Sequence, residues 1–134
     1  NMSYYLNLSK KLNINNQIFF TGPRSDVNDF YTISDIFLFP THYDPFSNVV
    51  LEAMYFENAV FTTRSNGASE ILDPDFIMNS PYDKKVATSI DNLLSNIITL
   101  NEVKIRNKKI SKQFPIEKNL KKTLEVINKI EKSF

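Results

Sequence analysis

Cysteine is absent from the 134-residue sequence, and histidine occurs once, as His42. Without cysteine the chain has no disulfide, no thiolate metal site and no cysteine nucleophile. A single imidazole also excludes a cluster of histidine metal ligands and a serine-histidine dyad elsewhere in the chain.

Glycine is nearly as scarce, with only Gly22 and Gly67. Neither the G-x-G-x-x-G fingerprint of dinucleotide-binding proteins nor the G-x-x-x-x-G-K-[ST] P-loop can be written with two glycines. Any phosphate bound here must be held without a glycine-rich loop.

Long hydrophobic runs are missing too. The longest, such as "DIFLFP", fall far short of the roughly 20 residues that a membrane helix needs, and the N-terminal "NMSYYLNLSKKL" is too polar for a signal peptide. We expect a cytoplasmic location. The net charge is +1 but uneven, because residues 101–134 hold ten Lys/Arg and four Asp/Glu, whereas residues 1–100 hold six and eleven.

The apolar residues that are present follow helical and extended spacings in turn. Helices are predicted over residues 2–12, from a cap at Ser25 or Asp26 through Ile33, from a cap at Ser47 or Asn48 through Phe56, and over 83–99, 102–112 and 116–132. Strands are predicted over 17–22, 35–40, 58–64 and 75–78, with a turn and a short helical or extended piece at 66–72. The pattern predicts an α/β fold, a Rossmann-like parallel sheet flanked by helices, with a helical tail over 83–134.

Sheets of this kind bind ligands at the carboxyl ends of their strands, which selects the loops 22–26, 41–48 and 64–69. The middle loop carries two acids, Asp44 and Glu52, eight positions apart across a helix start. The unpaired N–H groups from Phe46 to Val49 can seat an anion, an effect of about 0.3–1 kcal/mol per charge. Glu52 lies one turn on and can accept hydrogen bonds from a vicinal diol.

Phosphate, ribose and a second polyol together would describe a nucleotide sugar. The alternative on spacing alone is that Asp44 is an ordinary loop acid and that Glu52 complements the helix dipole. Arg24 can contact a base or phosphate or be a plain surface arginine. His42 is interpreted as a neutral loop residue, with sugar contact as the alternative, and Glu70 can cap a helix or lie near the ligand.

The ordered motifs of residues 17–72 add a resemblance. They are "IFFTG", "YTISD", "IFLFPT", an acid followed after seven residues by "EAM", "AVFTT" and "NGASEI". This series resembles the C-terminal, donor-binding domain of glycosyltransferase family 4, retaining enzymes of the GT-B fold. The resemblance implies that the whole chain is one partial donor-binding domain. The first strands of this domain, with their "G-R" and "K-G" cations, and the N-terminal acceptor domain would then be absent.

Carried over by position, the resemblance implies that Glu52 binds the donor ribose and that Asp44 lies near the sugar hydroxyls, so both are the candidate catalytic residues. The implied donor-binding residues are Gly22, Arg24, Asp44, Phe46, Ser47, Asn48, Val49, Glu52, Asn66 and Gly67. Three positions depart from the family pattern: Asp44 stands for Glu, Ser47 for Gly and Asn66 for the first Gly of a Gly-Gly pair.

The resemblance further implies transfer of a sugar from a UDP-, GDP- or ADP-sugar to an acceptor hydroxyl, without cofactor or metal. The expected setting is synthesis of bacterial surface polysaccharide, lipopolysaccharide or glycolipid. The glycan or glycolipid acceptor would be bound by the N-terminal domain, and the full-length protein could lie at the inner face of the membrane. The isolated chain is expected to be inactive.

Two alternatives come from other classes. The Lys-rich tail could bind nucleic acid or an anionic membrane, but its lysines alternate with apolar residues and acids as on a solvated helix face. The two carboxylates could serve a glycoside hydrolase, but their placement at a helix start, away from an open sugar cleft, argues against it.

Overall fold

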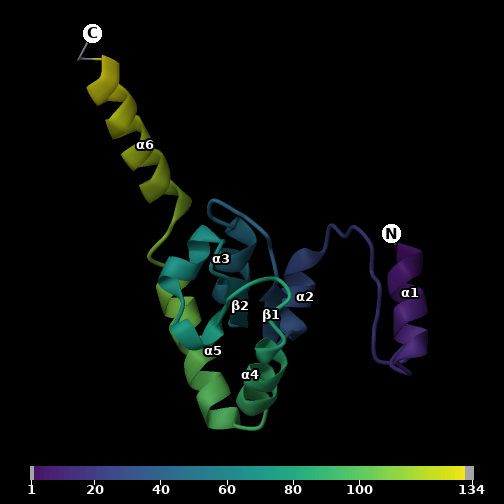
Figure 1. Ribbon diagram of the computed structural model, residues 1–134. Coiled ribbons are helices and arrows are strands. Elements are labelled where there is room, and N and C mark those ends of the chain that lie inside the picture. Colours follow the sequence, from purple (N-terminus) through teal and green to yellow (C-terminus); the bar gives the residue numbers. More distant parts are fainter. Residues whose placement is uncertain (1, 132–134) are drawn as a thin grey trace.

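The computed structural model describes residues 2–131, which build a parallel sheet of three strands in the order β1-β2-β3. The strands are β1 (Ile36–Phe39), β2 (Ala59–Thr63) and β3 (Ile77–Met78). The helices are α1 (Met2–Lys11), α2 (Val27–Ile33), α3 (Asn48–Tyr55), α4 (Lys85–Leu94), α5 (Ile97–Ser111) and α6 (Ile116–Glu131), with short 3-10 helices η1 (Gly67–Ile71) and η2 (Pro74–Phe76). Figure 1 shows the sheet at the centre of a compact body from which α1 and α6 extend on opposite sides.

Helices cover the sheet on both faces because the side chains of a strand alternate between them. Every residue of β2 is buried. Val60 packs into a cluster with Tyr31 of α2 and Met54 of α3, whereas Phe61 packs with Leu93 of α4 and residues of α5. The predicted α/β fold with a covered parallel sheet is confirmed.

The end of α3 sets the start of β2. Glu57 has a positive φ of 62°, its N–H bonds the Met54 carbonyl at 3.1 Å, and the Asn58 N–H bonds the Ala53 carbonyl at 3.0 Å. This is the Schellman arrangement, which usually places glycine where Glu57 stands. The turn leads the chain directly from α3 into β2.

The predicted helix from residue 2, the strands at 35–40 and 58–64 and the helix that follows Ser47 are confirmed within one or two residues at each end. The strand predicted at 17–22 is wrong. Ile18, Phe19 and Phe20 are exposed, and the segment runs from α1 to α2 without pairing to β1 (Figure 1). An apolar run forms a strand only where a neighbour completes its hydrogen bonds, and among the described residues none pairs with this one.

The boundaries after residue 72 also differ. The predicted helix 83–99 ends at Leu94, because the Asn96 side chain accepts a hydrogen bond from the Thr99 N–H at 3.2 Å and starts α5 there. Half of the predicted strand 75–78 belongs to η2, which has Pro74 at its first turn, and the last two residues form β3 and pair with β2. Segment 66–72 takes its helical alternative as η1, and residue 132 of the last predicted helix lies outside the described residues.

The predicted helical tail, residues 83–134, consists of two parts, of which only the first packs against the sheet. Leu93 of α4 and Leu100 and Val103 of α5 are buried against the sheet, so both helices belong to the domain core. Of the three helices of the predicted tail, only α6 extends from the body, beyond Pro115 (Figure 1).

Candidate functional site

The loops that follow β1 and β2 are joined at the carboxyl edge of the sheet. Asp44 and Asn66 form an isolated parallel bridge, in which the Asp44 N–H bonds the Ser65 carbonyl at 3.2 Å and the Gly67 N–H bonds the Asp44 carbonyl at 2.9 Å. Thr63 adds a third link, since its hydroxyl donates to the Thr41 carbonyl at 2.7 Å. The predicted middle and last loops therefore form one surface.

Gly67 is required by this close approach. A Cβ built on Gly67 would lie 1.9 Å from the Pro45 carbonyl oxygen, well inside van der Waals contact. The glycine thus lets the two loops meet backbone to backbone, and its own N–H is already bonded to Asp44.

Asn66 is fully buried and organises the start of α3. Its Oδ1 accepts from the Ala68 N–H at 3.0 Å and the Ser47 N–H at 3.4 Å, and its Nδ2 donates to the hydroxyls of Ser47 at 3.1 Å and Thr62 at 3.0 Å. The backbone N–H of Asn66 bonds the Thr63 carbonyl. The Asn66 side chain is therefore engaged in hydrogen bonds that hold the two loops together.

The N-terminus of α3 offers free donors above this support. Ser47 occupies the N-cap position, but its side chain makes no cap hydrogen bond. In residues 2–131 the N–H groups of Asn48 and Val49 have no hydrogen-bond partner, as expected for a first helical turn. These two amides, with the positive end of the helix dipole, can donate hydrogen bonds to an anion.

Asp44 stands directly before this helix start and is half-buried. Its Oδ1 accepts from the Phe46 N–H at 3.0 Å, which fixes the carboxylate in a local turn. Its Oδ2 has no hydrogen-bond partner in the described part of the chain. Asp44 can therefore present one oxygen to a ligand while the other holds the loop.

Glu52 is exposed one turn along α3, and its Oε2 accepts from the Tyr31 hydroxyl at 3.5 Å. It also lines a hollow of about 390 Å³ with Phe114 and Pro115 from the α5–α6 junction. Burial, then the charge of Glu52 and its hydrogen bond, raises the pKa of Tyr31, so the phenol stays protonated and donates.

The first predicted loop is not joined to the other two by any hydrogen bond within residues 2–131. Gly22 has φ +63° in open space. The Arg24 guanidinium donates to both oxygens of Asp26 at 2.8 and 2.6 Å and lies 5.7 Å from the Phe30 ring. The hydrogen bonds of this pair raise the pKa of Arg24 and lower the pKa of Asp26. Because both Asp26 oxygens are bonded to Arg24, the Asp26 side chain caps no N–H group of α2.

Two tyrosines outside the predicted site reach its residues. Tyr31 contacts Glu52. It is the first residue of the "YTISD" motif, so the motif could have marked Tyr31 as part of the site. The Tyr82 hydroxyl lies 3.3 Å from His42 Nε2, with the rings edge to face, and so links the loops after β1 and β3. No motif in the sequence marked Tyr82. Glu70 is exposed on η1.

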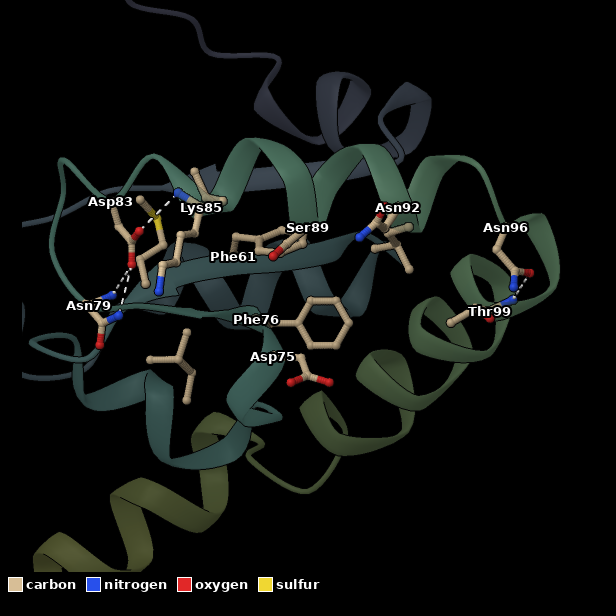
Figure 2. Close-up of a pocket in the computed structure, with 14 residues that line it drawn as sticks. Phe61, Asp75, Phe76, Asn79, Asp83, Lys85, Ser89, Asn92, Asn96 and Thr99 are labelled. Atoms are coloured by element: carbon tan, nitrogen blue, oxygen red, sulfur yellow. Dashed lines mark hydrogen bonds between the residues drawn. The ribbon is translucent and has the colours of Figure 1, made fainter.

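A larger hollow of about 470 Å³ lies between η2, β3, α4 and α5, and contains none of the predicted site residues. Figure 2 shows hydrogen bonds at two places on its lining: Asp83 accepts from Asn79 and from the Lys85 N–H, and Asn96 caps α5 at the other end. The hydrogen bond from the Asn79 backbone N–H is the largest of the effects that lower the pKa of Asp83. Asp83 and Asn96 thus hold the turn before α4 and the start of α5.

Within residues 2–131, no group of three or more His, Asp or Glu side chains is placed to hold a metal ion. No helix in the same range is both long and apolar enough to cross a membrane.

Comparison with known proteins gives a family match over most of the chain. The model described as "Glycosyl transferases group 1" matches residues 2–112. A relative from Staphylococcus aureus, the capsular polysaccharide biosynthesis glycosyltransferase CapM, is 35% identical over 75 residues, which cover 54% of this chain and 20% of CapM.

Solved structures share the fold at low identity. HepE of Anabaena, crystallised with UDP, superposes with a TM-score of 0.87 at 18% identity over 96% of this chain and 36% of HepE. A glycosyltransferase from Rickettsia africae superposes with a TM-score of 0.86 at 23% identity, over 99% of this chain and 37% of the Rickettsia chain. Sucrose-phosphate synthase from Thermosynechococcus elongatus superposes with a TM-score of 0.83 at 17% identity, over 96% of this chain and 34% of the synthase chain. The chain thus spans about a third of these structures and a fifth of CapM.

Proposed function

The chain belongs to the group 1 glycosyl transferases, and on this premise we propose that it binds the nucleoside-diphosphate sugar from which such an enzyme transfers a sugar. The observation that carries the proposal is the carboxyl edge of the sheet. There the free amides of Asn48 and Val49 lie between the carboxylates of Asp44 and Glu52 in sequence. HepE, which shares the fold, has been crystallised with UDP and with UDP-glucose.

Each group has a chemical part in this proposal. The amides at the start of α3 neutralise charge on the diphosphate, including the charge that develops as the sugar leaves. Glu52 accepts hydrogen bonds from the two ribose hydroxyls. Asp44 accepts from a sugar hydroxyl, and its short side chain, fixed at Oδ1, restricts which hydroxyl it reaches.

The backbone around Phe46 and Ser47 lies close to the same seat and completes the proposed donor site. Asn66 and Gly67 support it from below, because their N–H groups are bonded within the loops. Gly22 and Arg24 remain proposed neighbours of the base.

The reaction we propose is that of glycosyltransferase family 4: transfer to an acceptor hydroxyl with retention of anomeric configuration and without a metal ion. The relative CapM is named for capsular polysaccharide biosynthesis, which supports a glycan or glycolipid acceptor. The acceptor would be bound by a part of the enzyme that the chain does not span. We also propose a cytoplasmic location.

We propose, in addition, peripheral contact of the whole protein with an anionic membrane. The support is α6, which exposes Leu120, Leu124 and Ile127 on one side and carries Lys118 and Lys121. Such helices lie in the interface of acidic bilayers. Co-sedimentation with phosphatidylglycerol vesicles at low and high salt tests this, and equal pelleting with phosphatidylcholine vesicles would contradict it.

The donor proposal is tested by saturation-transfer NMR with UDP-, GDP- and ADP-glucose on the protein and its Asp44→Asn variant. We expect one nucleotide to give strong ribose and sugar signals, and the variant to lose saturation at the sugar while it keeps the ribose. The absence of saturation with all three nucleotides would contradict the proposal.

A further inference from the structure

Tyr31 connects the core of the domain to the proposed ribose site. Its side chain is only 5% exposed, yet its hydroxyl lies 3.5 Å from Oε2 of the exposed Glu52 on the neighbouring helix. The two residues are 21 positions apart, so the contact depends on the packing of α2 against α3.

The ring of Tyr31 is held on several sides. Its centroid lies 5.5 Å from that of Phe37, edge to face, and 5.9 Å from that of Phe56 in a stacked arrangement. Its carbonyl oxygen accepts from Asn58 Nδ2 at 2.8 Å, and the Asn58 carbonyl accepts from Asn107 Nδ2 of α5 at 2.9 Å. Elements from both faces of the sheet therefore fix Tyr31.

Glu52, by contrast, is an exposed side chain with three rotatable bonds, and such a side chain loses conformational entropy when it binds a ligand. A fixed donor at Oε2 favours one orientation of the carboxylate before the ligand binds, and Oε1 has no hydrogen-bond partner in the described part of the chain. Burial of the phenol raises the pKa of Tyr31, so the hydroxyl keeps its proton at neutral pH and donates to the carboxylate. Preorganisation of this kind increases affinity by lowering the entropic cost of binding.

We infer that Tyr31 is a positioning residue that orients the Glu52 carboxylate toward the vicinal hydroxyls of a nucleotide ribose. The inference rests on the proposed function and adds a residue that acts through Glu52 without touching the ligand.

The test is calorimetric titration of UDP and of 2′,3′-dideoxyuridine diphosphate into the protein and Tyr31→Phe. The variant keeps the ring and removes one hydroxyl, so we expect UDP affinity to fall about five- to tenfold. Affinity for the dideoxy nucleotide, which has no diol, should be unchanged. The matched control is Tyr55→Phe on α3, whose hydroxyl makes no hydrogen bond in the described part of the chain and whose removal should change neither affinity.

A cycle with Glu52→Ala separates positioning from plain stability. Because Tyr31 acts through Glu52, the double variant should bind UDP no more weakly than Glu52→Ala alone. Equal losses for UDP and the dideoxy nucleotide in Tyr31→Phe would overturn the inference, since the hydroxyl would then act through the fold. Wild-type UDP affinity in Tyr31→Phe beside a clear loss in Glu52→Ala would overturn it and leave the proposed function intact. No binding of UDP, GDP or ADP by the wild type would contradict both.

Discussion

Asn66 and Ser47, nineteen residues apart, are joined by hydrogen bonds in both directions, from the Ser47 N–H to Asn66 Oδ1 and from Asn66 Nδ2 to the Ser47 hydroxyl. The pair ties the end of β2 to the first residue of the α3 cap. Both side chains are buried, so the bonds are shielded from water. The position of the proposed diphosphate seat is thereby fixed by the sheet.

Asn66→Ala should destabilise the protein by about 2–4 kcal/mol, because it leaves the N–H groups of Ala68 and Ser47 without their buried acceptor. Urea unfolding measures the change. Asn101→Ala, at an exposed position of α5, is the matched control and should shift the free energy of unfolding by less than about 0.5 kcal/mol. Equal effects of the two substitutions would show that the buried bonds contribute little.

Gly67→Ala should cost about 3 kcal/mol, because the new Cβ meets the Pro45 carbonyl oxygen and the two loops must separate. Gly22→Ala should cost only about 1 kcal/mol, since its positive φ is unfavourable for alanine but the surrounding space is open. Thermal unfolding of both variants compares a steric clash with backbone strain. A smaller loss for Gly67→Ala than for Gly22→Ala would mean that the loops do not meet as described.

The sequence alone predicts the parts of this site that depend on local patterns. The apolar runs that become β1 and β2, the helix start at Ser47 and the loop order follow from periodicity and from the rule for parallel sheets. The roles of Asn66 and Gly67 cannot be predicted this way, because they arise from contacts between loops nineteen or more residues apart. The strand predicted at residues 17–22 is wrong for a related reason, since its apolar letters cannot reveal whether a pairing partner is present.

The ion pair between Glu57 and Lys108 makes part of the stability depend on pH. The hydrogen bond from Lys108, and then its charge, lowers the pKa of Glu57. A carboxyl with a lowered folded-state pKa stabilises the protein above its unfolded pKa of about 4.3, and this contribution is lost as pH falls through the folded value. Both side chains are more than one third exposed, which limits the contribution to about 0.2–1 kcal/mol.

Urea unfolding of the wild type and of Glu57→Gln, from pH 3 to pH 7, checks this. The wild type should be the more stable above pH 5, and the difference should shrink toward zero near pH 3 and in 1 M NaCl. A difference that stays constant over this range of pH would rule out the ion pair as its source.

Binding of the donor ribose by Glu52 is tested by calorimetric titration of UDP into the protein and its Glu52→Ala variant. Glu102→Ala, which removes an exposed acid on α5, serves as the control. UDP affinity should be at least about tenfold lower in Glu52→Ala, as expected for lost hydrogen bonds to a charged acceptor, and unchanged in Glu102→Ala. Equal UDP affinity in the wild type and Glu52→Ala would remove Glu52 from the ribose site.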